Sequence, residues 1–196
     1  MVEHTAPPAY LLTGEPRTGK STLIKRLVEQ IGIARCGGFY TEEVQENGAR
    51  RGFRLVTLDG RTGIFAHKSL RSPIHHGRYG IDLPCLETLG LPALSDALKK
   101  GALVIIDELG PMEAYSESFR VKVLDVLNST APFLGTIAAK PHPWLDTLKR
   151  HKRVMLYQLT RNNREEVFRS ILNATRVALL HDKGRTDVIG HEDSSE

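Results

Sequence analysis

A short stretch near the N-terminus, residues 9–27 (AYLLTGEPRTGKSTLIKRL), constrains the fold more than any other part of the sequence. It begins with a five-residue apolar run ended by Gly14, which is typical of a buried strand. After the second glycine, aliphatic residues recur at helical spacing as far as a stop at Gly32. Between the two elements, residues 14–21 match G-x4-G-K-[ST], the motif of a phosphate-binding loop. The sequence therefore predicts a strand, a phosphate-binding loop and a helix, in this order.

The chemistry of this loop follows from its residue types. Its glycines allow successive backbone N–H groups to point inward, and the start of the following helix adds a partial positive charge. Lys20 can reach the β- and γ-phosphates of a nucleotide, and the hydroxyl group of Ser21 can bind Mg²⁺. A glycine-rich turn with a solvated lysine is the alternative, but the position between a strand and a helix favours phosphate binding. The residues expected to bind the nucleotide here are Gly14, Glu15, Pro16, Arg17, Thr18, Gly19, Lys20, Ser21 and Thr22.

Two consecutive carboxylates follow a second apolar run, in the sequence LVIIDE. Asp107 ends this run, where it would face the phosphates across the carboxyl edge of a sheet and help to hold Mg²⁺. Glu108 comes next and could orient and deprotonate an attacking water molecule. A simple nucleotide kinase does not need such a base, because hydrolysis would waste its nucleotide. We therefore expect Lys20 and Glu108 to be catalytic; the alternative for Glu108 is a capping or salt-bridge role.

The rest of the chain alternates between strand and helix patterns. Asn47-Gly48 and Asp59-Gly60 favour tight hairpin turns, because both dipeptides tolerate positive φ. The run Leu103 to Ile106 is apolar on both faces, as in a strand covered by helices on both sides. We expect strands near 39–45, 52–58, 62–67, 103–106, 133–138 and 154–160, helices near 85–100, 116–129, 144–150 and 162–181, and a loop over 71–84.

This alternation predicts an α/β fold, with a mostly parallel sheet flanked by helices and an added antiparallel hairpin region. A chain of 196 residues is of ordinary size for one domain. We expect this domain to span residues 1–182. Residues 183–196 show no hydrophobic periodicity and are expected to form a flexible tail.

Composition narrows the classes of protein further. A net charge of +4 suits a polyanionic ligand but is too small to indicate nucleic-acid binding by itself. No apolar run approaches the ~20 residues that a membrane span needs, and the first ten residues lack the basic and apolar parts of a signal peptide. We expect a cytoplasmic protein with no membrane partner. In that compartment Cys36 and Cys85 are most simply reduced core thiols.

Five stretches together resemble the THEP-type nucleoside-triphosphatases, which include the human cancer-related NTPase. They are GEPRTGKST, GGFYTEEV, GRYGID, DELGPME and TRNNR, and the resemblance covers about residues 9–175. It implies a RecA-like P-loop fold and Mg²⁺-dependent hydrolysis of NTP to NDP and phosphate. It also implies slow turnover and loose base preference, so ATP, GTP, CTP and UTP are all expected substrates. We expect the protein to be a monomer.

The resemblance leaves three residue roles open. The family's loop usually has smaller residues after its first glycine, so Arg17 could act as a built-in arginine finger or could project into solvent. Glu42 and Glu43 of GGFYTEEV would lie near the nucleotide, beside Thr41, but neighbouring strand residues face opposite sides and spacing does not select one. In TRNNR, Asn163 or Arg164 could contact the base or ribose, whereas an asparagine there is also a good N-cap.

Two other functions remain possible for such a sequence. A small-molecule or nucleoside kinase would need an acceptor pocket, which residues 68–90 could form. A nucleotide-gated RNA-binding or partner-binding module would use slow hydrolysis as a timer. Against the latter, the aromatic residues do not alternate with Arg and Lys as stacking platforms do. The aromatic residues concerned are Phe39, Tyr40, Phe53 and Tyr79.

Overall fold

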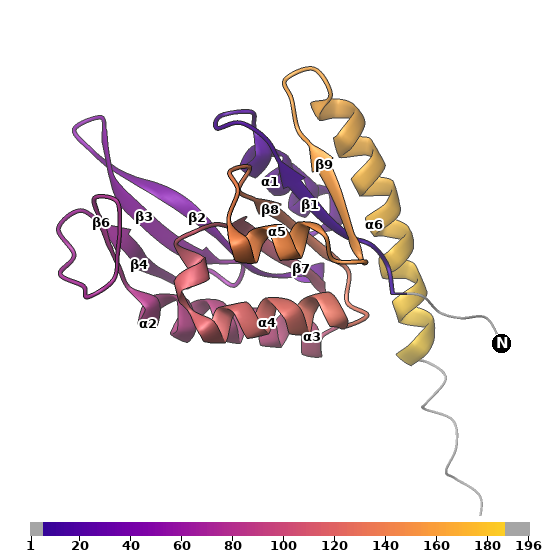
Figure 1. Cartoon of the computed structure of the whole chain (residues 1–196). Coiled ribbons are helices and arrows are strands. Elements are labelled where there is room, and N and C mark those ends of the chain that lie inside the picture. Colours follow the sequence, from indigo (N-terminus) through magenta and orange to yellow (C-terminus); the bar gives the residue numbers. More distant parts are fainter. Residues whose placement is uncertain (1–5, 187–196) are drawn as a thin grey trace, which may run out of the picture.

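The computed structural model describes residues 6–186, whose strands form one nine-stranded mixed sheet (Figure 1). The order of the strands is β5-β6-β4-β3-β2-β7-β8-β1-β9. The strands are β1 (Ala9–Thr13), β2 (Cys36–Glu46), β3 (Ala49–Thr57), β4 (Thr62–His67), β5 (His75–His76), β6 (Tyr79–Ile81), β7 (Leu103–Leu109), β8 (Phe133–Ile137) and β9 (Val154–Gln158). Neighbours from β2 to β9 are parallel, whereas β2, β3, β4, β6 and β5 pair antiparallel. The predicted α/β class, with an added antiparallel region, is confirmed.

Helices cover both faces of the parallel part. On one face, α1 (Lys20–Ile31) and α6 (Arg164–Thr186) pack their apolar side chains against one side of β1, β7 and β8. On the other face lie α3 (Leu91–Lys99), α4 (Glu117–Asn128) and α5 (Pro143–Lys149). Strands buried on both sides need apolar residues throughout, and every residue of β1 and β8 is indeed buried.

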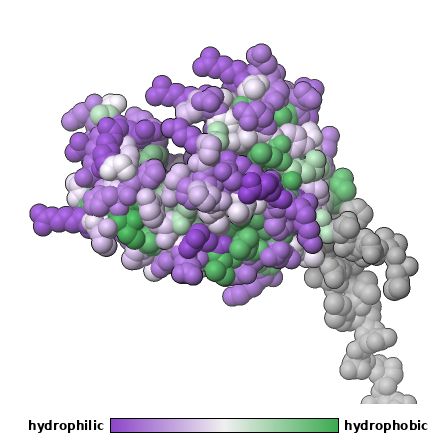
Figure 2. Space-filling view, viewed as in Figure 1, coloured by the Kyte–Doolittle hydropathy of each residue, from purple (hydrophilic) through white to green (hydrophobic). Residues whose placement is uncertain are grey.

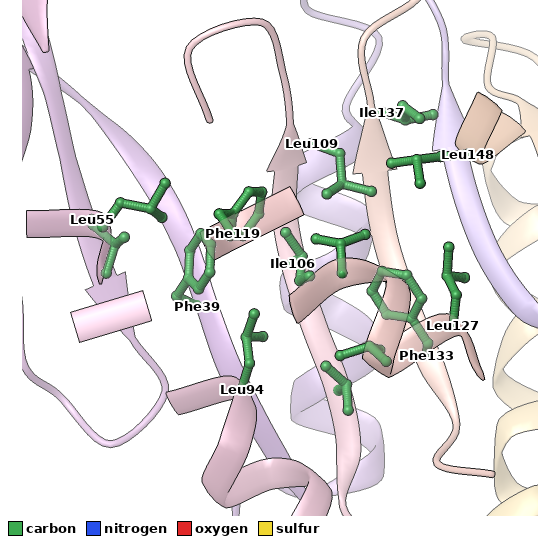
Figure 3. Packing of buried hydrophobic residues seen from close by; sticks show 14 of the residues in the cluster. Phe39, Leu55, Leu94, Ile106, Leu109, Phe119, Leu127, Phe133, Ile137 and Leu148 are labelled. Atoms are coloured by element: carbon green, nitrogen blue, oxygen red, sulfur yellow. The ribbon is translucent and has the colours of Figure 1, made fainter. Parts of the chain in front are cut away.

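The larger core cluster lies between the sheet and α3, α4 and α5 (Figure 3). In it the rings of Phe39 from β2 and Phe119 from α4 lie 6.0 Å apart, and Trp144 of α5 contacts Phe119 edge-on at 6.2 Å. Aromatic pairs at this separation add packing energy beyond the area they bury. This cluster holds β2 against β7, and the pairing of the two strands ends at Tyr40 and Asp107.

The expected loop over 71–84 is partly wrong. The short strands β5 and β6 lie there, followed by a helical segment built from α2 (Leu83–Cys85), a π-helical turn (Leu86–Gly90) and α3. The sequence does not reveal β5 and β6, because strands of two and three residues carry too little alternation to show a period. They add to the edge of the antiparallel region through pairing with β4.

The predicted end of the last helix is also wrong. Helix α6 begins at Arg164 and runs to Thr186, so the first four residues of the expected tail are helical. Residues 187–196, the remainder of that tail, lie outside the described residues. Both cysteines are free thiols, as expected, but only Cys85 is fully buried.

A buried arginine ties the start of β9 to the loop before β8. The guanidinium group of Arg153 donates to the carbonyl oxygens of Pro7 at 2.6 Å, Val126 at 2.9 Å and Ser129 at 2.8 Å, and also to that of Ala131. These carbonyls lie at or beyond the end of α4 and at the entry to β1, where backbone acceptors lack helix or sheet partners. Arg153 therefore supplies the donors that these three segments need.

The face of the molecule in Figure 2 is mostly hydrophilic, with small separate groups of hydrophobic residues. Single exposed apolar residues are common on soluble domains and need no special explanation. In the part of the chain that the structure describes, no helix combines the length and the apolar character needed to cross a membrane.

Candidate active site

The loop between β1 and α1 has the backbone of an anion cradle. Its φ angle is positive at Gly14 (148°), Arg17 (64°) and Gly19 (93°), which turns successive N–H groups toward the inside of the loop. Gly14 has a further reason to be glycine, because a Cβ atom there would lie 2.5 Å from the carbonyl oxygen of Leu159. The predicted phosphate-binding loop therefore has the conformation that its function requires.

Lys20 lies across this loop. Its Nζ atom donates to the carbonyl oxygens of Gly14 at 2.8 Å and Glu15 at 3.1 Å, and the hydroxyl group of Thr18 donates to Glu15 at 2.9 Å. The ammonium group is thus held at the mouth of the cradle and forms no ion pair with a carboxylate of residues 6–186. Arg17, by contrast, has an exposed side chain.

Asp107 lies near the end of β7, facing the start of α1. It is only 3% exposed, and its Oδ1 atom accepts a hydrogen bond from the hydroxyl group of Thr136 on β8. Burial raises the pKa of Asp107, while hydrogen bonds from Thr136 and Ser21 and the charge of Lys20 act in the opposite direction. The aspartate and the serine predicted to share a metal ion are therefore in contact.

The donor set at Asp107 and Ser21 fits Mg²⁺. The Oδ2 atom of Asp107 is buried and has no hydrogen-bond partner among the residues described. Such an orphaned acceptor is costly unless a cation or water satisfies it. Within residues 6–186 no cluster of three or more His, Cys, Asp or Glu could hold a metal. One carboxylate and one hydroxyl suffice for Mg²⁺, which keeps several waters and takes its other ligands from phosphates.

Glu108 is half-buried beside this pair. Its pKa is raised, first by burial and then by the charge of Asp107, while Lys20 lowers it. The influence of Lys20 shows that the carboxylate lies within electrostatic reach of the phosphate-binding loop. Glu108 therefore lies on the same side of the sheet edge as Lys20, as the prediction of a base near the loop requires.

The structure distinguishes the two glutamates of GGFYTEEV. Glu42 faces α1 and forms ion pairs with Lys25 at 2.9 Å and with Arg54 at 2.7 Å, whereas Glu43 faces the other side and pairs with Arg50. Thr41 connects this strand to Asp107, because its hydroxyl group donates to the carbonyl oxygen of Asp107 at 3.3 Å. Glu42 is thus the member of the pair that lies on the same side of the sheet as α1.

A pocket of about 290 Å³ lies beside the loop, between the start of α1 and the segment that precedes α6. Its lining residues are Gly19, Thr22, Leu23, Arg26, Arg161, Asn162, Arg164 and Glu165. The side chain of Arg164 lies against Gly19, where a Cβ atom would be 3.3 Å from two of its atoms. The pocket is open and polar, and it adjoins the phosphate cradle directly.

The side chain of Asn163 stabilises the turn after β9 by hydrogen bonding to its backbone. Its Oδ1 atom accepts from the backbone N–H of Thr160 at 2.8 Å, and its Nδ2 atom donates to the carbonyl oxygen of Gln158 at 2.9 Å. The amide group is thereby used in shaping the turn that presents Arg164. Of the two predicted contact residues in TRNNR, the structure brings Arg164 to the pocket and gives Asn163 a supporting position.

Comparison with known proteins agrees with this geometry. A family model described as NTPase matches residues 9–172, which is most of the chain. The chain belongs to the THEP1-type NTPase family. Nucleoside-triphosphatase THEP1 of Thermotoga sp. (strain RQ2) is 39% identical over 166 residues, covering 85% of this chain and 94% of the relative.

Two solved structures of THEP1-type NTPases have the same fold. The crystal structure of THEP1 from Aquifex aeolicus has a TM-score of 0.76 and 35% identity, covering 84% of this chain and 97% of that one. The solution structure of a human cancer-related nucleoside triphosphatase has a TM-score of 0.73 and 33% identity, with 88% and 98% covered. The RecA-like P-loop architecture implied by the resemblance is thereby confirmed.

Sequence reasoning about this NTPase site missed two residues. Thr136, which bonds to Asp107, was expected only as part of a strand; a polar residue in an otherwise apolar strand was the available signal. Glu113 was recognised only as part of the DELGPME motif, without a role. It is 3% exposed, which is rare for a glutamate without a cationic partner.

Proposed function

We propose that the protein is a Mg²⁺-dependent nucleoside-triphosphatase that hydrolyses NTP to NDP and phosphate, with Glu108 activating the water. The observation that carries the proposal is the position of Glu108, directly after the metal aspartate and within reach of the charge of Lys20. A carboxylate at that point adjoins the place where the γ-phosphate of a bound nucleotide would lie. The names of the relatives, which are nucleoside-triphosphatases, support the same reaction.

In the proposed reaction, backbone N–H groups of residues 14–19 and the Nζ atom of Lys20 bind the β- and γ-phosphates. Ser21 and Asp107 hold Mg²⁺, which neutralises phosphate charge when bound. Glu108 accepts a proton from water as the water oxygen bonds to the γ-phosphorus atom, and the bond from that atom to the β,γ-bridging oxygen breaks. Lys20 stabilises the negative charge that the departing NDP oxygen gains.

The pocket beside the loop is the proposed place for the ribose and base. The guanidinium group of Arg164 can stack on a flat base, and this contact does not depend on which base is present. Thr22, Arg161 and Asn162 also line the pocket, and the remaining polar side chains, Arg26 and Glu165, form an ion pair with each other. An open pocket lets water compete for the edge of the base, which supports the proposal that ATP, GTP, CTP and UTP are all substrates.

The alternative functions receive less support. The second half of the stretch 68–90, which a kinase would use as an acceptor site, is partly buried, as at Tyr79, Ile81, Cys85 and Leu86. The arginines of the β2–β3 hairpin, Arg50, Arg51 and Arg54, are each paired with a glutamate. Paired arginines are poorly placed to bind RNA phosphates. We propose that the protein acts as a monomer in the cytoplasm.

The test is the variant Glu108→Gln. Phosphate release from NTP, measured with no acceptor added, should fall by about 10²–10⁴, the range for loss of a general base. Binding of a non-hydrolysable NTP analogue should stay close to that of the unmodified protein. The matched control is Glu43→Gln, which makes the same chemical change on the opposite face of β2. Parallel losses of binding and turnover in Glu108→Gln would contradict the proposed role.

A further inference from the structure

Glu113 is a buried carboxyl group that the reaction as described so far does not use. It opens a 3-10 turn (Glu113–Tyr115), which begins three residues after β7 ends. The residue is 3% exposed, and it forms no ion pair with any of the residues described in the structure. Burying a carboxyl group in this way is costly, so its position calls for a specific reason.

The carboxyl groups of Glu113 and Glu108 converge on Gly110. A Cβ atom at position 110 would lie 2.7 Å from the Oε2 atom of Glu113 and 3.6 Å from the Oε1 atom of Glu108. The backbone N–H groups of Gly110 and of Glu113 itself lie close enough to the Glu113 carboxyl group to lower its pKa, against the larger effect of burial. The N–H of Ala114 closes the same turn by donating to the carbonyl oxygen of Gly110 at 3.2 Å.

We propose that Glu113 is a positioning residue for NTP hydrolysis: by binding the backbone at Gly110 it fixes the turn against which the Glu108 carboxylate rests. This inference rests on the proposed role of Glu108 as general base. A general base must be held in a productive geometry, and supporting hydrogen bonds from neighbouring residues commonly do this. A misplacement of about 1 Å is enough to lower a rate by about 10². Glycine at position 110 allows both carboxyl groups to approach the same point.

The protonation state of Glu113 is part of this role. Burial, and then the nearby charge of Glu108, raises the pKa of Glu113 to about 8; Asp107 acts in the same direction. Glu108 and Asp107, both on β7, are the charged groups that face it. Below pH 8 the group is a neutral acid that can lie behind Glu108 without repelling it. Above pH 8 it gains a charge, which would push Glu108 away and repel the γ-phosphate.

Two substitutions separate positioning from a general structural role. Glu113→Ala removes the acceptor for the Gly110 amide and should lower kcat by about 10–100-fold while leaving the Kd of a non-hydrolysable NTP analogue within about threefold. Glu113→Gln keeps a neutral group of the same size and should restore kcat at pH 7 to within about threefold. The matched control is Glu87→Gln, which alters a carboxylate bonded to Ser116 at 2.7 Å without contacting Glu108. It should leave kcat unchanged.

The pH profile gives a second readout, which does not require Glu113→Ala to fold. In the unmodified protein kcat should fall as pH rises through about 8, and in Glu113→Gln this fall should be absent. An unchanged alkaline fall in Glu113→Gln, or a kcat of a folded Glu113→Ala within twofold of the unmodified protein, would overturn the inference. If Glu108→Gln is severely impaired while the Glu113 variants are not, only the positioning role fails. If Glu108→Gln itself is fully active, the proposed function fails first.

Discussion

Replacing Arg153 by methionine should destabilise the protein strongly without touching the active site. Methionine has a similar length but no donor, so the carbonyl oxygens of Pro7, Ser129 and Ala131 would lose the guanidinium donor. A hydrogen bond to a charged group contributes about 1.5–3 kcal/mol, and a buried acceptor left alone carries its full desolvation cost. Three such bonds set an upper range of about 4.5–9 kcal/mol.

Two effects reduce that range. Burial lowers the pKa of Arg153, which shows that keeping the guanidinium group charged inside the protein has its own cost, and methionine avoids it. Water can also enter near Pro7 and Ser129, which lie closer to the surface. We therefore expect a loss of about 3–5 kcal/mol in the free energy of unfolding, or about 6–20 °C in Tm for a domain of this size.

The measurement is urea unfolding followed by circular dichroism, with Tm from a thermal scan. The control is Arg176→Met, which makes the same change on the exposed side of α6, where the arginine reaches only the carbonyl of Gln30 at 3.4 Å. That variant should change the free energy of unfolding by less than about 0.5 kcal/mol. Arg153→Lys should fall between the two, because an ammonium group reaches fewer of the carbonyls. A change below about 1 kcal/mol in Arg153→Met would refute the assigned role.

Three predictions concern the reaction itself. Lys20→Ala should lower NTP hydrolysis by at least about 10² and weaken nucleotide binding, since it removes the charge that bridges the β- and γ-phosphates; near-normal turnover would exclude the phosphate-binding loop. Asp107→Asn should raise the Mg²⁺ concentration at half-maximal rate by about tenfold or more, because an amide holds the metal and its waters less firmly; an unchanged midpoint would argue against metal binding there. The four common NTPs should differ in kcat/KM by no more than about two orders of magnitude, and a much larger preference for one purine would indicate a dedicated base pocket.

Sequence patterns predict those parts of the fold and of the site that depend on residues close together in the chain. The strand, loop and helix of residues 9–31 follow from apolar runs, helical spacing and glycines, all of which act over a few residues. Asp107 and Glu108 were found in the same way, because they end an apolar strand whose carboxyl edge must face the ligand. The long strands and most helices also appear within a few residues of their expected positions.

Other features depend on contacts between distant segments. Strands β5 and β6 are too short to show a pattern: β6 forms by pairing with the edge of β4, and β5 by pairing with β6. Whether Glu42 or Glu43 faces the nucleotide depends on the register of β2 against β7, and a shift of one residue would exchange them. The end of α6 was placed too early because its amphipathic pattern weakens before its backbone hydrogen bonds end.

The sequence by itself determined that this protein binds phosphate, because the loop at residues 14–21 carries its lysine, its serine and its glycines in one continuous stretch. Only the tertiary structure decided how the carboxylates around that loop are held. Thr136 on β8 donates to Asp107 on the neighbouring strand β7. The carboxyl group of Glu113 lies against Gly110, at the start of the same turn. The physical reason is that hydrogen bonding and burial depend on distance in space, whereas sequence patterns report only the neighbours along the chain.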